Sequence, residues 1–252
     1  MTDIPGITLA CFGLVGTLVT DDGAIELAFA EAIATQGVVS GTSAFAKSMA
    51  VVHRTRGQPP PEVLRAVFPD NLPRAQAAQL AFDRSLAGTV DRRTASAIPG
   101  AREVLSGLAE AGCRICVMTI MPRRELTALL QASGLRDVVN VALCADDVPR
   151  GCPFPDLALA AMLRTGVGEV GETAMVHGTA AGVECGRRAG ASVVVGVLTG
   201  PHPAARLHKA GATHVIKTIA QLPGMLAGAG ALATVPRQAT LESAPPIRPA
   251  GS

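Results

Sequence analysis

The sequence is poor in aromatic residues. It has no tryptophan, no tyrosine and six phenylalanines among its 252 residues. Proteins that bind single-stranded nucleic acid commonly stack bases on aromatic side chains. The 22 basic residues form no basic run, and the formal net charge is only +2. The composition therefore argues against a nucleic-acid partner.

Long apolar runs are missing as well. Although 48% of the residues are hydrophobic, no stretch approaches the ~18 apolar residues that cross a bilayer. The start of the sequence lacks the basic segment and apolar stretch of a secretory signal. We therefore expect a globular, cytoplasmic protein with no membrane partner, of a length that suits one domain with an insertion.

A disulfide framework is not indicated either. The six cysteines stand singly among apolar or small residues, unlike the cysteines of small secreted domains. Cys113 and Cys116 match a C-x-x-C pattern, but in a strand residues three apart point to opposite faces. We predict reduced, structural thiols there, and a redox pair or zinc site is the less favoured alternative.

Short apolar runs alternate with helical patterns along most of the sequence. The predicted strands are residues 7–12, 114–118, 138–143, 174–176, 192–197 and 214–216. The predicted helices between them are residues 101–111, 123–132, 155–164 and 181–189, several of which end at a glycine. Continuous apolar strands separated by helices are typical of parallel sheets covered on both faces. The pattern predicts a Rossmann-like, doubly wound α/β core.

Residues 23–96 break this alternation, since they contain only helical patterns, at 24–36, 61–67 and 74–86. In open α/β sheets ligands bind beyond the carboxyl ends of the strands, so an insertion after the first strand would cover that crevice. We predict three parts: an α/β core of residues 1–22 and 97–227, a helical cap of residues 23–96, and a disordered Ala-, Pro- and Gly-rich tail of residues 228–252.

Several motifs identify a resemblance. The first strand leads into Gly13-Leu14-Val15-Gly16-Thr17, and three further stretches follow in order: CADDVPRGCPFPD at 144–156, GRRAGA at 186–191 and GVLTG at 196–200. With these motifs, residues 7–226 resemble the haloacid dehalogenase superfamily, and within it the phosphonoacetaldehyde hydrolase-like group. The resemblance implies a Rossmann-like core, a cap, and an ancestral phosphohydrolase or phosphonatase reaction.

The resemblance also implies catalytic residues that this sequence lacks. The family attacks phosphorus with an Asp where Gly13 stands here, while Mg²⁺ neutralises the developing charge. The Lys or Arg of the third motif is replaced by Cys152, which brings no fixed positive charge. Val15 fits the small apolar residue of the phosphonoacetaldehyde hydrolase-like group, and Thr119 matches the Ser or Thr that hydrogen-bonds the phosphoryl group.

Metal and cap positions are changed too. The fourth motif of the family reads Gly-Asp with a second Asp four residues on, and the corresponding residues here are His177, Gly178 and Gly182. Mg²⁺ prefers octahedral oxygen ligands, so we predict that the metal site is lost and that no cofactor is bound. The cap lysine that forms a Schiff base in true phosphonoacetaldehyde hydrolases is matched by His53, and Lys47 lies on the other side of Met49.

We therefore predict a catalytically degenerate protein with a binding or regulatory role, taking a small anionic ligand between core and cap. The predicted vestigial phosphate pocket consists of Gly13, Val15, Gly16, Thr17, Thr119, Cys152, Gly178 and Thr179. No partner chain or oligomeric state is indicated.

Alternative hypotheses remain open. The main one is a hydrolase of a small phosphorylated or phosphonate compound, in which an acidic pair, 21–22 or 146–147, rescues the chemistry. Another is new nucleophilic or metal chemistry by Cys152 with His177 or His53. Arg54 and Arg56 could face an anion, although arginines on a cap helix are more often solvated.

Overall fold

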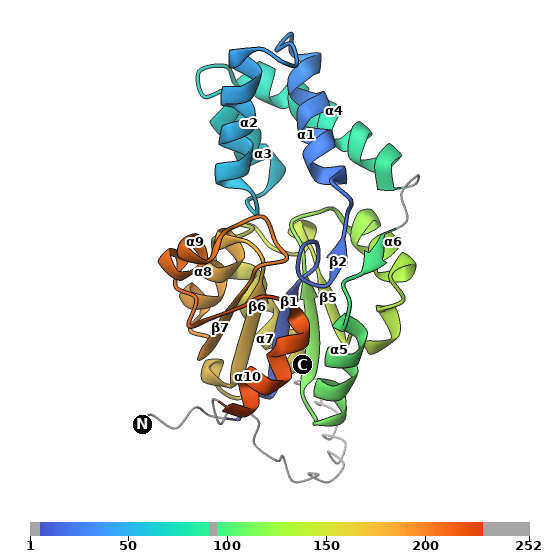
Figure 1. Cartoon of the computed structure of the whole chain (residues 1–252), viewed down its shortest axis with the longest axis vertical. Coiled ribbons are helices and arrows are strands. Elements are labelled where there is room, and N and C mark those ends of the chain that lie inside the picture. The colour runs from blue at the N-terminus through green and yellow to red at the C-terminus, as the bar shows by residue number, and fades with distance from the viewer. Residues whose placement is uncertain (1–5, 91–94, 229–252) are drawn as a thin grey trace, which may run out of the picture.

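In the part of the chain that the structure describes, six parallel strands form the central sheet. The computed structural model describes residues 6–90 and 95–228, and Figure 1 shows the sheet at its centre. The strand order is β5-β4-β1-β6-β7-β8. The strands are β1 (Leu9–Gly13), β4 (Arg114–Met118), β5 (Val141–Leu143), β6 (Thr173–His177), β7 (Val193–Val197) and β8 (His214–Ile216). The order reverses on either side of β1, so a ligand crevice is expected beyond the carboxyl ends of β4, β1 and β6.

Two apolar clusters cover the two faces of the sheet, because successive strand residues point to opposite sides. In β1, Ala10 and Phe12 belong to one cluster, whereas Leu9 and Cys11 belong to the other. The first cluster includes residues of α5 (Ala101–Glu110), α6 (Arg123–Ala132) and α10 (Leu222–Gly228). The second includes residues of α7 (Asp156–Thr165), α8 (Ala180–Ala189) and α9 (Ala204–Ala210). This arrangement confirms the predicted α/β fold class.

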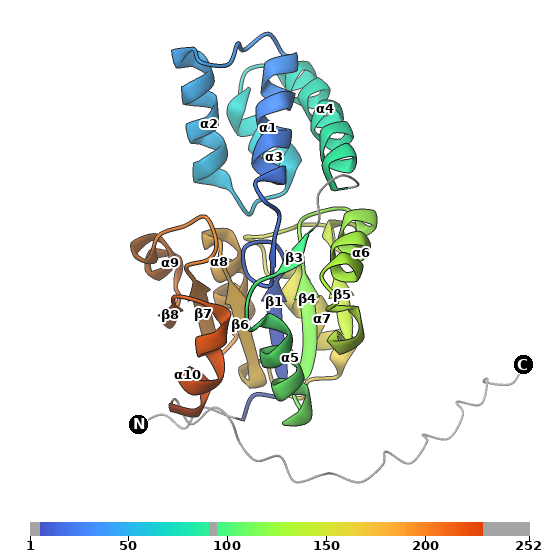
Figure 2. The same ribbon diagram turned by 45° about the vertical axis from the view of Figure 1, so that its right-hand side comes forward.

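Four helices in the described part of the cap lie beyond the carboxyl ends of the strands, as Figures 1 and 2 show. They are α1 (Ala24–Thr35), α2 (Ser43–Thr55), α3 (Pro60–Val67) and α4 (Leu72–Val90). Antiparallel pairing of β2 (Val19–Thr20) with β3 (Ser96–Ala97) joins the two connections between cap and core. The ring centroids of Phe29 and Phe82 lie 4.4 Å apart, and this aromatic contact packs α1 against α4.

Some local predictions are corrected by the structure. The strand predicted at 138–143 begins only at Val141, because a 3₁₀ turn, Arg136–Val138, precedes it. Helices α2, α9 and α10 were not predicted, although Thr42 provides a side-chain N-cap for α2 by accepting a hydrogen bond from the Phe45 N–H at 3.2 Å. The predicted tail lies outside the described residues, apart from Gly228 at the end of α10.

Other predictions agree with the structure. Cys113, which directly precedes β4, and Cys116 within it lie in different apolar clusters, as expected for residues three apart in extended chain. The glycines after the four predicted core helices adopt positive φ angles; they are Gly112, Gly134, Gly166 and Gly190. Within the described part of the chain, no helix combines the length and the apolarity that crossing a membrane demands.

Candidate functional site

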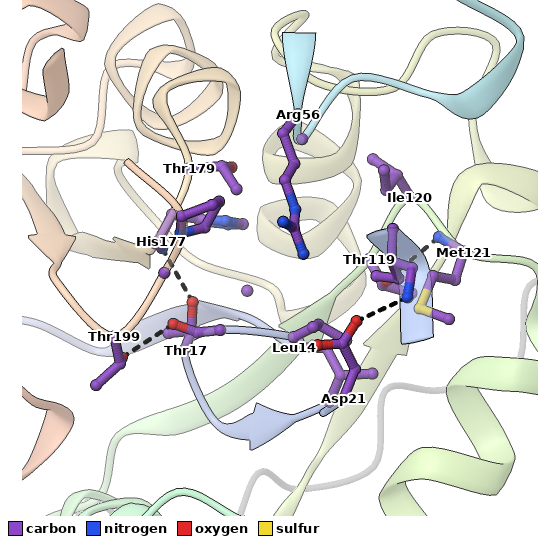
Figure 3. Close-up of a pocket in the computed structure, with 18 of the residues that line it drawn as sticks. Leu14, Thr17, Asp21, Arg56, Thr119, Ile120, Met121, His177, Thr179 and Thr199 are labelled. Carbon is purple, nitrogen blue, oxygen red and sulfur yellow. Dashed lines mark hydrogen bonds between the residues drawn. The ribbon is translucent and has the colours of Figure 1, made fainter. Parts of the chain in front are cut away.

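A cavity of about 670 Å³ lies between the carboxyl ends of the strands and the cap (Figure 3). The core contributes Gly13 at the end of β1, Thr119 after β4, and His177 at the end of β6. The cap contributes Arg56, the residue after α2. All eight residues assigned to the vestigial pocket line this cavity: Gly13, Val15, Gly16, Thr17, Thr119, Cys152, Gly178 and Thr179.

The imidazole of His177 fills the space beside two of the altered motif positions. A Cβ atom placed on Gly13 would lie 2.6 Å from His177 Nδ1, and a Cβ atom on Gly182 would also overlap the ring. His177 is 7% exposed, and its Nε2 atom has no hydrogen-bond partner among the described residues. Burial lowers the pKa of this imidazole to about 4, so the ring is neutral at pH 7.

Three backbone segments meet closely next to this ring. A Cβ atom on Gly178 would lie 2.7 Å from the Gly200 Cα and 2.8 Å from the Gly16 carbonyl oxygen. The Thr199 hydroxyl donates to that same oxygen at 3.0 Å, and the Gly178 N–H donates to Thr17 Oγ1 at 3.0 Å. The backbone therefore leaves no room for a side chain at Gly178.

This geometry does not fit a magnesium site of the family type. A carboxylate at Gly178 would collide with backbone, and a carboxylate at Gly182 would collide with His177. Mg²⁺ needs near-octahedral oxygen ligands at short range. Within the described residues, no group of three or more His, Cys, Asp or Glu side chains is arranged to hold a metal ion.

Asp21 is the one carboxylate among the described residues that line the cavity. Its two oxygens accept hydrogen bonds from backbone N–H groups at the start of α1, from Ile25 at 3.0 Å and from Gly23 at 3.3 Å. A carboxylate in this position caps the helix and interacts favourably with its dipole. The other acidic pair, Asp146 and Asp147, does not line the cavity.

Three threonine hydroxyls in the cavity wall accept backbone hydrogen bonds. Thr17 accepts from Gly178, Thr119 accepts from the Met121 N–H at 3.2 Å, and Thr179 accepts from the Gly182 N–H at 3.2 Å. Each hydroxyl keeps its own proton, and none donates it to an acceptor in the described chain. Three hydrogen-bond donors are therefore available to a ligand.

Arg56 is the one lysine or arginine among the described lining residues. Its side chain is 18% exposed and points from the cap into the space between Thr17 and Thr119 (Figure 3). Its Nη1 atom forms an ion pair with Glu26 at 3.1 Å. The expectation that cap arginines are solvated is thus wrong for Arg56, whereas Arg54 is exposed.

Cys152 lines the cavity as a free thiol that is hydrogen-bonded to the thiol of Cys185. Its hydrogen bond with Cys185, together with burial, raises the pKa of Cys152 well above the usual range. A raised pKa keeps the sulfur protonated and weakens it as a nucleophile. No hydrogen bond between Cys152 and His177 is present in the described chain, so this geometry does not support the proposed Cys-His pair.

His53 lies outside the cavity, which corrects its expected place in the crevice. Its side chain is 54% exposed, and its Nε2 atom lies within hydrogen-bond distance of Glu26 Oε1, at 3.2 Å. Its carbonyl oxygen accepts a hydrogen bond from His202 Nε2 at 3.1 Å, and His202 Nδ1 accepts one from the Ala180 N–H at 2.8 Å. His202, which the sequence did not single out, therefore connects the cap to the first residue of α8.

The sheet order, the inserted cap and a cavity at the strand ends define a protein of the haloacid dehalogenase-like fold. Residues 7–190 match the haloacid dehalogenase-like hydrolase family, and the chain belongs to that family. A phosphonoacetaldehyde hydrolase from Bordetella pertussis is 31% identical over 153 residues, which cover 52% of this chain and 55% of that protein. The chain thus matches about half the length of this curated relative.

Solved structures show the same fold over most of the chain. A hydrolase from Pseudomonas syringae is 25% identical with a TM-score of 0.76, and the match covers 88% of this chain and 98% of that one. A phosphonoacetaldehyde hydrolase-like protein from Oleispira antarctica is 23% identical with a TM-score of 0.79, and the match covers 91% of this chain and 95% of that one. The sequence match to the Bordetella pertussis protein confirms the resemblance to the phosphonoacetaldehyde hydrolase-like group.

Proposed function

We propose that this protein is a non-hydrolytic member of the family, which binds a small anionic ligand between core and cap in a binding or regulatory role. The proposal rests on the position of the His177 ring, which takes the space that a side chain at Gly13 would need. The position from which the nucleophilic Asp of the family would attack has no side chain, and the imidazole fills the adjacent space. Loss of a nucleophile typically costs several orders of magnitude in rate.

Other catalytic groups of the family are also without a counterpart in the cavity. No lysine is among the described lining residues, so the amine for a Schiff base is missing there. Cys152 stands at the position of the Lys or Arg, and the room for magnesium carboxylates is taken by His177 and by backbone. Asp21 is engaged with the start of α1. These substitutions favour binding over phosphoryl transfer.

The anion-binding part of the proposal is supported by Arg56 and the threonine hydroxyls. A guanidinium has five N–H donors and stays protonated at any physiological pH. Thr17, Thr119 and Thr179 present unused hydroxyl protons to the same cavity. Such a set of donors can hold an anion without a metal ion.

A phosphate-release assay tests the proposal. The purified protein and an Asp21→Asn variant are incubated with phosphonoacetaldehyde and with small phosphomonoesters, in Mg²⁺ and in EDTA, beside a mock purification. We expect no release above the mock level in any condition. Mg²⁺-dependent turnover by the unmodified protein would contradict the proposal, and its loss in Asp21→Asn would make Asp21 the candidate nucleophile of a hydrolase.

A further inference from the structure

The chemistry of the cavity wall points to one class of ligand. Building on the binding role proposed above, we infer that the ligand is a monocarboxylate with an apolar body. The carboxylate binds Arg56 with the hydroxyls of Thr17 and Thr119, and the body packs against the apolar wall of the cavity.

The charge of the cavity favours a single negative charge on the ligand. Among the described lining residues, Arg56 carries the one positive charge, Asp21 carries a negative one, and the buried His177 is neutral. A phosphate monoester carries about −1.5 to −2 at pH 7. Because Asp21 offsets Arg56, the whole of this charge would stay uncompensated in a partly buried cavity, which costs more than the single charge of a carboxylate. A carboxylate carries −1 and matches one guanidinium.

Arg56 has free donors for this role. Glu26 uses only the Nη1 atom, and no acceptor in the described chain engages Nε or Nη2. Glu26 is 45% exposed and also lies within hydrogen-bond distance of the exposed His53, so it lies at the outer side of the guanidinium. The inner side faces the cavity between Thr17 and Thr119 (Figure 3). This edge can bind a carboxylate through two parallel N–H donors.

The remaining wall is suited to an apolar body. Its partly exposed apolar side chains come from both core and cap and include Val15, Ile25, Ala97, Pro99 and Ile120. A volume of about 670 Å³ falls within the usual range for sites of medium-sized organic ligands. A two-carbon phosphonate would fill only a small part of it.

Calorimetric titration of the full chain tests the inference. The probes are acetate, butyrate, hexanoate and octanoate, with octan-1-ol, inorganic phosphate and phosphonoacetate as comparisons at equal ionic strength. Each buried methylene should tighten binding by about fourfold, so Kd should fall steadily from butyrate to octanoate. Octanol, phosphate and phosphonoacetate should bind at least tenfold more weakly than octanoate.

Variants of two neighbouring arginines test the position of the carboxylate. Arg56→Gln should weaken octanoate binding by tenfold or more, and Arg56→Lys should recover part of the loss. Arg54→Gln is the matched control, because Arg54 is exposed and outside the cavity wall, so it should bind as tightly as the unmodified protein. Thermal unfolding of each variant establishes that it is folded.

The contrary outcomes separate this inference from the binding role. Phosphate or phosphonoacetate binding more tightly than octanoate, without turnover, would overturn the inference and leave the binding role standing. The inference would also be overturned if Kd did not depend on chain length, if octan-1-ol bound as tightly as octanoate, or if Arg56→Gln bound octanoate as tightly as the unmodified protein. Phosphate release in the assay described above would instead overturn the non-hydrolytic role, whatever the carboxylates do.

Discussion

The ring of His177 occupies the space that a side chain at position 13 would need: a Cβ atom on Gly13 would lie 2.6 Å from Nδ1 and 2.9 Å from Cε1. The same ring blocks position 182 on α8. A bulky residue at the end of β6 is therefore matched by glycines on the two segments that face it. Because interiors are close-packed, the three positions are expected to behave as one packing unit.

The first prediction concerns this unit. Gly13→Ala should destabilise the protein by about 1–3 kcal/mol, since overpacking forces neighbouring side chains to shift. In a His177→Ala background the same change should cost much less, so a double-mutant cycle should give a coupling of at least ~1 kcal/mol. Urea denaturation of the four proteins measures it. Additive effects would contradict the packing unit.

Restoration of the family residues is subject to the same constraint. The set Gly13→Asp, Cys152→Lys and Gly182→Asp restores the family base and the two acids whose space the His177 ring takes, and leaves out Gly178, where backbone leaves no room. It should not bind Mg²⁺ while His177 is present, because the ring excludes both new carboxylates. Adding His177→Gly should improve Mg²⁺ binding, measured by calorimetry. Equal Mg²⁺ affinity of the two sets would show that the ring does not control the site.

A pH dependence follows from the burial of His177. Its pKa falls from 6.5 to about 4 on folding, so between these values the unfolded chain binds a proton that the folded protein does not. Stability from this group is therefore complete above about pH 6.5 and is lost as the pH falls toward 4, by about 3 kcal/mol in total.

Urea denaturation at pH 7 and at pH 4.5 measures this loss. His177→Gln should lose about 2–3 kcal/mol less than the unmodified protein between the two pH values. His208→Gln, which changes an exposed histidine, should lose as much unfolding free energy between the two pH values as the unmodified protein. If all three proteins lose stability equally, the buried imidazole is not the cause.

The close approach of three backbone segments predicts the effect of a single methyl group. Gly178→Ala should destabilise by about 1–3 kcal/mol or more, since its Cβ would meet the backbone of Gly200 and Gly16 rather than a movable side chain. Gly107→Ala is the matched control. No atom lies within 4 Å of a Cβ there, on the exposed side of α5, and alanine favours the helix by up to ~1 kcal/mol. The midpoint temperature of thermal unfolding should fall for Gly178→Ala and rise for Gly107→Ala.

The connection through His202 should control how the cap sits on the core. His202→Ala removes both hydrogen bonds, from His202 Nε2 to the His53 carbonyl and from the Ala180 N–H to His202 Nδ1. An unsatisfied N–H costs about 1–3 kcal/mol, so amide exchange at Ala180 and at the end of α2 should become faster. His208→Ala should leave both regions protected. Unchanged exchange in His202→Ala would show that other contacts hold the cap.

The core could be predicted from sequence because its signals are local. The strands at 114–118 and 214–216 and the helix at 123–132 match the observed bounds, since apolar periodicity and glycine helix ends act over a few residues. The three unpredicted helices include α9 and α10, each seven residues long. Short helices give little periodicity and depend on packing for their stability.

The sequence by itself determined that the eight motif residues lie at the cavity, since the carboxyl ends of parallel strands meet at one edge of the sheet and the motif order assigns residues to those ends. Only the tertiary structure decided what they do there. It brought the His177 ring against Gly13, which is 164 positions away, turned Arg56 inward and left His53 outside. These relationships depend on side-chain directions across distant elements, which no local pattern encodes.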